Sequence, residues 1–295
     1  MQTKEILQKI FSLKNKGNHK VLTVCGIKLK IKRKMQFVAQ PELIPEQKSY
    51  IPYIETHICD HCNLNCKGCG HFSPLVSEVF AEYEQYEKDI NELASKLIIG
   101  QIRLMGGEPL LHPEVNKFIM ATRKAFPETD IRLVTNGILL PTMKENFWQT
   151  LRDNNIRVDM SKYPVCGNKF SEYLDLMDDN NVTLCNINLS KKFFSQTNPK
   201  GDSNIIDTYN NCLSKHCANL WRSRLYTCPA CYLHYCDEYF GTNYKIQDGL
   251  DIYALRGEEI AVNLNSPINQ CRYCATETLK SFAWDQSKLE LKEWF

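Results

Sequence analysis

The sequence lacks any long hydrophobic run. No window approaches the ~18 to 20 apolar residues that a transmembrane helix requires, so no membrane span is expected. The segment MQTKEILQKIFSLKNKGNHK contains neither an apolar core nor a small-residue cleavage site, so it does not resemble a secretory signal. Charges nearly cancel over the 295 residues, with a formal net charge of +2, which indicates no nucleic-acid partner. We therefore expect a cytoplasmic protein.

Cysteine, by contrast, is abundant, with 14 residues in the chain. Cys25, Cys166 and Cys185 stand alone, whereas the others fall into clusters. The clusters are Cys59, Cys62, Cys66 and Cys69; Cys212, Cys217, Cys228, Cys231 and Cys236; and Cys271 and Cys274. In a reducing compartment such clusters indicate metal binding or catalysis more often than disulfides.

The run CNLNCKGC places Cys62, Cys66 and Cys69 close together on one segment. Thiolates are the usual ligands of iron–sulfur clusters. Three of them can hold three irons of a four-iron cubane and leave the fourth iron open to a substrate or cosubstrate. Two further motifs follow, GGEP at residues 106–109 and VTNG at residues 134–137.

In their order and separation the three motifs resemble the radical S-adenosylmethionine (SAM) superfamily. The resemblance implies a [4Fe–4S] cluster on Cys62, Cys66 and Cys69, with SAM bound at the open iron. One-electron transfer to the sulfonium of SAM then yields a 5′-deoxyadenosyl radical, a chemistry that the cofactors supply and the protein positions. The resemblance also implies a flavodoxin- or ferredoxin-type electron donor.

The same resemblance assigns residues to the binding of SAM. The two glycines of GGEP lack side chains, so the backbone can approach the methionine end closely, and the glutamate is expected to meet the ammonium group. The implied SAM-binding residues are Gly106, Gly107, Glu108, Thr135, Asn136 and Ser161. One position departs from the family pattern: Gly68 precedes the third cysteine, where an aromatic residue often packs near adenine. We expect Phe72 or another residue to replace it.

Strand and helix patterns alternate through residues 51–200, which predicts an α/β domain with parallel strands and helical crossovers. Such sheets place their sites at the carboxyl ends of strands, where each motif falls. The sequence therefore predicts a partial (β/α)6 TIM-like barrel, which is also the fold that the resemblance implies. Strands are expected at 53–58, 102–105, 131–135, 156–160 and 182–187, and helices at 83–98, 114–125, 143–154 and 169–180.

Residues 1–50 form a basic appendage and linker before this domain. Lys and Arg dominate residues 1–36, where Glu5 is the only acid. Alternation of Ile and Lys over residues 27–32, with Cys25-Gly26 as a turn, predicts a short β-hairpin with one basic face. This face is either a solvated strand face or a weak contact site for an anionic surface or substrate.

Residues 201–295 break the barrel pattern and are expected to form a small cysteine-rich domain. The close pair Cys271 and Cys274, together with earlier cysteines around a short hairpin, resembles the Twitch domain, a shortened SPASM domain. The resemblance implies an auxiliary [4Fe–4S] cluster on Cys217, Cys228, Cys271 and Cys274. Cys212 could replace Cys217. Cys231 and Cys236 are surplus, and one of them could be a ligand or a hydrogen-atom donor.

The cysteine spacing resembles Twitch enzymes of the 2-deoxy-scyllo-inosamine dehydrogenase type, which oxidise a cyclitol alcohol. The basic N-terminal segment resembles an element of bacterial glycosyltransferases and other surface-polysaccharide proteins. We therefore predict an oxidoreductase that dehydrogenates or epimerises a sugar, cyclitol or nucleotide-sugar for a surface glycan. Candidate catalytic residues are Lys162, Tyr163 and Cys236, with Cys166 and Cys185 as other hydrogen donors for epimerisation. The alternative interpretation of the first two is an exposed lysine and a packed tyrosine.

Two other functions are consistent with these motifs. Many SPASM-type enzymes modify ribosomal peptides, although the basic strand does not resemble their leader-binding element. A zinc-binding scaffold without catalysis is the second alternative, since zinc prefers four protein ligands. The ligands available at the first loop would be Cys59, Cys62, Cys66 and Cys69, or His57, His61 and His71.

Overall fold

The computed structural model describes the backbone of residues 11–16, 19–24, 27–32, 48–167, 170–189, 191–229 and 249–295. Side chains are described for the same residues except those of 11–32, Cys166, Phe170, Asn188 and Leu189. The chain divides into two compact units, residues 1–47 and residues 48–295. The second unit contains the cysteine loop and the helices described below.

The described part of the first unit is an antiparallel sheet of three strands. They are β1 (Phe11–Lys16), β2 (His19–Val24) and β3 (Ile27–Lys32), in that order. β2 and β3 form the expected hairpin, with Val24 opposite Ile27; its turn lies outside the described residues, and β1 was not expected. Because successive residues alternate between faces, Lys28, Lys30 and Lys32 share one face. Contact of that face with an anionic surface stays a prediction.

The second unit is built on an eight-stranded sheet in the order β12-β11-β10-β4-β5-β6-β7-β8. The strands are β4 (Ser49–Cys59), β5 (Leu97–Gly106), β6 (Asp130–Thr135), β7 (Arg157–Lys162), β8 (Leu184–Leu189), β10 (Asn219–Trp221), β11 (Arg224–Tyr226) and β12 (Leu250–Asp251). From β10 to β8 the neighbours are parallel, and β11 and β12 continue antiparallel. Among the described residues the sheet does not close, so it is the partial α/β barrel that the sequence predicts.

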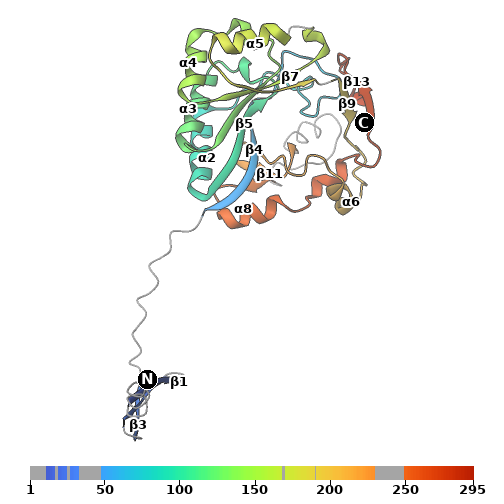
Figure 1. The fold of residues 1–295 in the computed structure, drawn as a ribbon. Coiled ribbons are helices and arrows are strands. Elements are labelled where there is room, and N and C mark those ends of the chain that lie inside the picture. Colours follow the sequence, from blue (N-terminus) through green and yellow to red (C-terminus); the bar gives the residue numbers. More distant parts are fainter. Residues whose placement is uncertain are drawn as a thin grey trace. The chain divides into compact units, whose positions relative to one another are not determined.

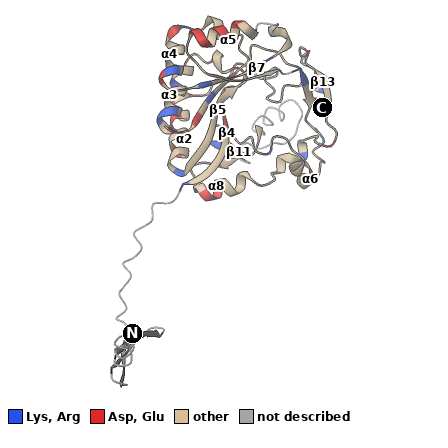
Figure 2. Ribbon diagram, viewed as in Figure 1, with Lys and Arg blue, Asp and Glu red and all other residues tan. Residues whose placement is uncertain are grey.

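Helices cover one side of this sheet, with α2, α3 and α4 stacked beside it (Figure 1). They are α2 (Tyr83–Lys96), α3 (Val115–Ala125), α4 (Glu145–Asp153), α5 (Phe170–Asp179), α6 (Ile205–Asn210) and α8 (Gly257–Leu264). α2 buries Tyr86, Ile90 and Leu93, which are spaced so that they lie on one face of the helix. Acidic residues are present on α4 and α5 (Figure 2). No helix in the described part of the chain has the length and apolar character needed to cross a membrane.

The predicted elements differ from the observed ones mainly at their ends. The helix expected to reach residue 98 ends at Lys96, and β5 begins directly at Leu97. The β-branched residues Ile98 and Ile99 favour the strand, and Ile99 is buried. Every strand and helix predicted between residues 53 and 187 has a counterpart in the structure.

The segment assigned by sequence to a C-terminal domain contributes directly to the main sheet. β10 pairs in parallel with β4, with Asn219 opposite Glu55, and α8 packs near β4 through the buried Ile260 and Leu264. A separate two-stranded sheet joins β9 (Lys192–Ser195) to β13 (Lys280–Ala283). The domain boundary at residue 200 stays a prediction, within a unit that spans residues 48–295.

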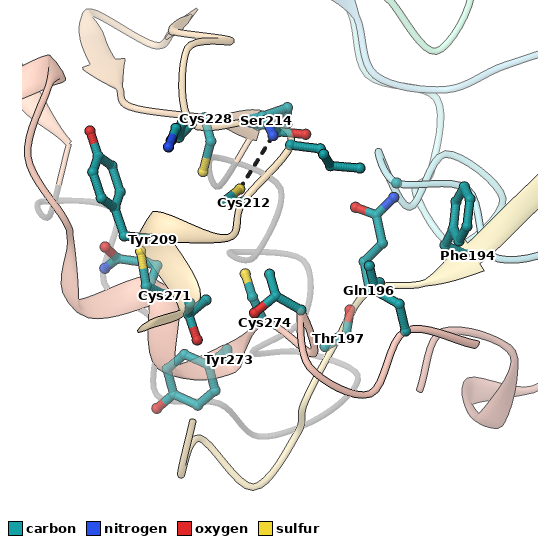
Figure 3. A pocket seen from close by; sticks show the side chains of 18 of the residues that line it. Phe194, Gln196, Thr197, Tyr209, Cys212, Ser214, Cys228, Cys271, Tyr273 and Cys274 are labelled. Atoms are coloured by element: carbon teal, nitrogen blue, oxygen red, sulfur yellow. Dashed lines mark hydrogen bonds between the residues drawn. The ribbon is translucent and has the colours of Figure 1, made fainter. Parts of the chain in front are cut away.

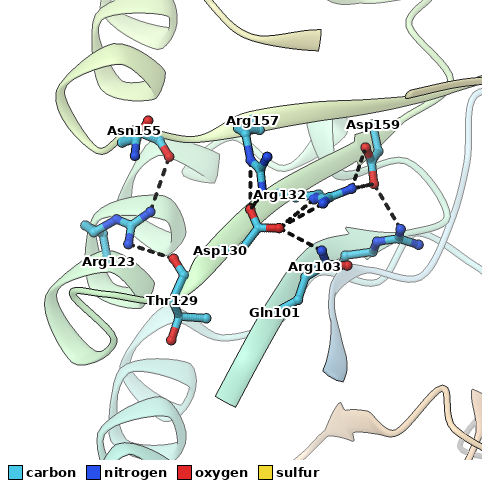
Figure 4. A network of polar contacts seen from close by, with 9 residues as sticks. All are labelled: Gln101, Arg103, Arg123, Thr129, Asp130, Arg132, Asn155, Arg157 and Asp159. Carbon is cyan, nitrogen blue, oxygen red and sulfur yellow. Dashed lines mark hydrogen bonds and ion pairs between the residues drawn. The ribbon is translucent and has the colours of Figure 1, made fainter. Parts of the chain in front are cut away.

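An ion-pair network joins the strands on the face opposite the helices (Figure 4). Asp159 on β7 pairs with Arg103 on β5 at 3.0 Å and with Arg132 on β6 at 3.2 Å. Arg132 also pairs with Asp130 at 2.9 Å, and Arg157 pairs with the same carboxylate. The network therefore crosses three neighbouring parallel strands.

Asp130 pairs with two arginines of this network, Arg132 and Arg157. Burial alone would raise its pKa, but hydrogen bonds from Arg157, Arg132 and Gln101 outweigh burial and lower the pKa to about 2. The charged carboxylate is thus the form that the fold stabilises. Its contribution is present at neutral pH and is lost only as the pH falls toward 2.

We expect Asp130→Asn to lower the free energy of unfolding at pH 7 by about 1 to 2 kcal/mol, because two arginines lose their shared charged acceptor. Urea denaturation measures the change. Glu128→Gln is the matched control, since Glu128 is exposed, and it should stay within about 0.5 kcal/mol of wild type. Equal stability of the two variants would contradict the assignment of Asp130 as a stabilising hub.

Candidate active site

The three motifs lie together at the carboxyl edge of the sheet. β4 ends at Cys59, and the cysteine loop follows it. β5 ends at Gly106, where GGEP begins, and β6 ends at Thr135, within VTNG. Since β4, β5 and β6 are parallel neighbours, their carboxyl ends meet at one edge, as the sequence predicts.

The thiols of Cys62, Cys66 and Cys69 form no disulfide and lie close enough to influence one another. Burial raises the pKa of Cys62; the backbone N–H of Leu64 opposes this effect, and the nearby Glu108, Cys69 and Cys66 reinforce it. Burial likewise raises the pKa of Cys69. The structure thus brings the three predicted cluster ligands to one place.

The donor set at this place fits an iron–sulfur cluster. Leu64 N donates to Cys62 Sγ over 3.3 Å, and Trp284 Nε1 donates to Cys66 Sγ over 3.1 Å. Such N–H donors stabilise the negative charge of cluster thiolates. In the part of the chain that the structure describes, no three His, Cys, Asp or Glu side chains are arranged to hold a single metal ion. A four-iron cubane is larger than one ion, and its thiolates stand farther apart.

Glu108 connects two of the motifs. Its side chain is fully buried and accepts hydrogen bonds from Thr135 Oγ1 at 2.7 Å, Asn136 N at 2.9 Å and Leu110 N at 3.1 Å. Asn136 in turn donates through Nδ2 to Asn63 Oδ1 over 2.7 Å, inside the cysteine loop. The expected contact of Glu108 with the ammonium group of SAM stays a prediction, as do the adenosine contacts of Thr135 and Asn136.

The two glycines of GGEP make room for the cysteine loop. A Cβ on Gly106 would lie 1.9 Å from the carbonyl oxygen of Cys59, and one on Gly107 would lie 2.2 Å from that of His61. The backbone N–H of Gly107 donates to Cys59 O over 2.7 Å. Any larger residue at either position would therefore push the two loops apart, whatever the contact of these glycines with SAM.

Tyr163 lies beside the three cysteines. Burial raises its pKa, and the nearby Cys69, Cys66 and Cys62 raise it further. Lys162 is buried, on the opposite face of β7 from Ser161, because neighbours in a strand alternate. Ser161 shares the face of Asp159, and its contact with adenosine stays a prediction.

A cavity of about 360 Å³ joins the cysteine loop to the second cysteine set. Gly68, His71 and Phe72 line it from the side of the loop. Cys212, Cys228, Cys271 and Cys274 line its other side (Figure 3). Ser214 N donates to Cys212 Sγ over 3.3 Å, and burial, with Cys271 and Cys212 nearby, raises the pKa of Cys274 to about 12. These four cysteines therefore line one cavity, and a second cluster bound to them stays a prediction.

Of the two alternatives for the first auxiliary ligand, the structure groups Cys212 with the other three cysteines. Cys217, the residue that the resemblance implies, does not line this cavity and lies near Glu55 and Arg103. Burial raises its pKa to about 11, with Glu55 and Cys212 adding to the effect and Arg103 opposing it. Spacing alone did not distinguish them because both precede the β10–β11 hairpin.

Of the remaining hydrogen-donor candidates, only the side chain of Cys185 is described, and it lies away from the site. Cys185 lies beside Arg157 and Arg132, near the amino ends of the strands and thus opposite the cysteine loop. Cys231 and Cys236 lie outside the described residues, and the side chain of Cys166 is not described. A catalytic role for Cys236 stays a prediction.

Sequence analysis missed the aromatic residues that reach the cysteine loop from the C-terminal end. Trp284 contacts Cys66, and Trp294 Nε1 donates to Cys69 O over 2.9 Å. A Cβ on Gly68 would lie 2.6 Å from Cζ of Phe282. The aromatic run Phe282-Ala-Trp284 was the available signal, but nothing in its local pattern gives its partner.

We expect the free energy of unfolding of the cluster-free wild-type protein to decrease, relative to that of Glu108→Gln, as the pH rises from about 5 to about 8. Burial raises the pKa of Glu108 to about 7, against hydrogen bonds from Asn136, Thr135 and Leu110 that lower it. The folded protein therefore holds a proton that the unfolded chain has released, and ionisation above pH 7 costs on the order of 3 kcal/mol. Urea denaturation at both pH values measures the difference. The amide of Glu108→Gln does not titrate, so it changes the free energy of unfolding by the same amount at every pH. If the free energies of wild type and variant differed by a constant between pH 5 and pH 8, the raised pKa of Glu108 would be contradicted.

Comparison with known proteins bears on the part of the chain that holds the motifs. Residues 56–161 match the family model of the radical SAM superfamily. GTP 3′,8-cyclase of Clostridium acetobutylicum is 34% identical over 125 residues, which cover 41% of this chain and 38% of that protein. The enzyme of the same name from Clostridium botulinum is 34% identical over 115 residues, or 38% and 36% of the two chains. The matches thus span little more than a third of the length of these relatives.

Solved structures give more distant similarities. BtrN in complex with AdoMet and 2-DOIA is similar over 77% of this chain and 94% of its own, with 18% identity and a TM-score of 0.45. The anSMEcpe structure with bound AdoMet covers 48% of this chain and 44% of its own, with 22% identity and a TM-score of 0.38. The family match includes the cysteine loop, GGEP and VTNG, so residues 56–161 match the radical SAM superfamily in the segment where these motifs indicate it.

Proposed function

We propose that the protein is a radical SAM oxidoreductase that oxidises an alcohol carbon of a sugar, cyclitol or nucleotide-sugar, with epimerisation as the alternative outcome. The observation that carries this proposal is the grouping of the three cysteines of the cysteine loop with GGEP and VTNG at one edge of the sheet. A cavity lined by Gly68, His71 and Phe72 of the cysteine loop and by a second cysteine set favours oxidation over epimerisation.

When bound, the two clusters would supply the electron that cleaves SAM and an acceptor for the electron that the substrate radical loses. Cys62, Cys66 and Cys69 would hold the first, and Cys212, Cys228, Cys271 and Cys274 the second. The alcohol gives a carbon-bound hydrogen atom to the 5′-deoxyadenosyl radical, its hydroxyl proton to a base, and one further electron, and it becomes a ketone. A flavodoxin- or ferredoxin-type protein is the electron donor that we propose.

The chain's own residues hold and orient the substrate in this proposal. Tyr163 keeps its proton at neutral pH because burial and the nearby cysteines raise its pKa, so its phenol donates a hydrogen bond instead of acting as a base. A role of Lys162 as the base stays a prediction, which would require its buried side chain to reach the substrate from the face of β7 opposite Ser161. The cavity also presents polar side chains beside the cysteine loop, among them Gln196 and Thr197, which suit a hydroxyl-rich ligand.

A nucleotide substrate is the second candidate. It is favoured by the similarity of the barrel region to GTP 3′,8-cyclases, at 34% identity. That similarity covers only the smaller part of either chain. The second candidate predicts that GTP is consumed, whereas the first predicts that a polyhydroxylated alcohol is oxidised.

We expect anaerobically reconstituted, reduced protein to release 5′-deoxyadenosine from SAM, and Cys66→Ala to release none. With the correct alcohol the product should be lighter by two hydrogens, whereas epimerisation leaves the mass unchanged and takes deuterium from solvent. Mass spectrometry of incubations with cyclitols, nucleotide-sugars and GTP measures all three outcomes. Iron-loaded wild type that never cleaves SAM would overturn the proposed function.

We expect the wild-type chain to bind roughly eight irons, the content of two four-iron clusters. Cys212→Ala should lose about half of that iron, because Cys212 lines the second cysteine cavity. Cys217→Ala is the matched control and should keep it, because Cys217 lies beside Glu55 and Arg103. Iron and sulfide assays measure the content. Loss of iron in the control alone would overturn our choice of ligand.

A further inference from the structure

The C-terminal segment, residues 280–294, runs beside the cysteine loop and is bound to it through the backbone. Lys67 N donates to Asp285 O over 3.0 Å, and Ser287 N donates to Asn65 O over 2.8 Å. Asn65 Nδ2 returns a hydrogen bond to Ser287 O over 3.1 Å. The segment therefore fixes the cysteine loop from a distant part of the sequence.

Trp284 is the residue of this segment that reaches a predicted cluster ligand. Its indole Nε1 donates to Cys66 Sγ over 3.1 Å, and Cys66 is only 6% exposed. The indole is oriented from two sides: Trp284 N donates to Lys191 O over 2.9 Å, and the ring lies 6.4 Å from that of Tyr163. The indole is thus positioned by Lys191, directly before β9, and by Tyr163, directly after β7.

Phe282 covers the next part of the loop. It would clash with any Cβ at Gly68, whose φ is +62°, and its ring lies 5.2 Å beneath the Lys67 ammonium. Phe282 also pairs with Phe193 of β9. Two aromatic residues from one segment therefore cover the loop from Cys66 to Gly68, and only one of them donates a hydrogen bond to sulfur.

We propose that Trp284 is a positioning residue that tunes the electron affinity of the first cluster through its N–H···S bond to Cys66. The inference rests on the proposed radical SAM function. A hydrogen bond to a cluster thiolate stabilises the reduced, more negative state more than the oxidised one. The bond therefore makes the cluster easier to reduce. It acts through Cys66, with no contact to SAM or substrate required.

The test compares two indole-to-phenyl substitutions in the full-length, iron-loaded protein. Trp284→Phe keeps a ring but removes the N–H donor to sulfur. Trp294→Phe is the matched control, because the N–H of Trp294 donates to the carbonyl oxygen of Cys69 in the same loop. Redox titration followed by electron paramagnetic resonance measures the midpoint potential of the SAM-binding cluster. We expect a shift to more negative potential in Trp284→Phe and none in Trp294→Phe.

An unchanged potential in Trp284→Phe, or an equal shift in both variants, would overturn the proposal. If Trp284→Phe takes up no iron, the second test is the rate at which the thiols of Cys66 and Cys62 are alkylated in cluster-free wild type and variant. Trp284→Ala should then make Cys66 react several-fold faster relative to Cys62, and an unchanged ratio would overturn the contact. Wild type that binds no iron would contradict the proposed function, and the alkylation ratio would still test Trp284 separately.

Discussion

The buried carboxylate of Glu108 is the constraint on which the site depends. A carboxyl group removed from water is costly unless hydrogen bonds replace its hydration, and here three donors satisfy its oxygens while only partly offsetting the cost of its charge. Two of the donors, Thr135 and Asn136, come from the end of the neighbouring strand. Satisfying this one group therefore requires the GGEP and VTNG loops to stay in register. Asn136 extends the requirement to the cysteine loop through Asn63.

Close backbone contact strengthens the same constraint. The cysteine loop begins where the main chain of Cys59 and His61 lies against Gly106 and Gly107. The loop is thus held on one side by GGEP and on the other by the C-terminal segment, at Asn65 and Lys67. Three thiols on an otherwise irregular loop become a defined donor set only because both sides are fixed. Preorganisation of this kind is what a cluster-binding loop requires.

Local patterns were sufficient for the barrel and for its motifs. Alternating strands and helices give parallel order, and parallel order brings strand ends together, so the meeting of Cys62, Glu108 and Asn136 followed from sequence. Contacts across long separations did not follow. Spacing did not distinguish Cys217 from Cys212, yet only Cys212 lines the cavity with Cys271 and Cys274, whereas Cys217 lies near Glu55 of β4. Likewise, no periodicity could show that residues 280–294 pair with the cysteine loop.

Gly68 illustrates how such a long-range contact decides a local residue. The backbone there has φ +62°, a conformation that favours glycine, and Phe282 occupies the space that a Cβ would need. An aromatic side chain at position 68 would have to displace Phe282, and with it the strand that carries Trp284. Glycine at position 68, where the family often has an aromatic residue, is therefore explained by the packing of the C-terminal segment against the cysteine loop. The aromatic surface beside the loop is not lost; it is supplied by a different part of the chain.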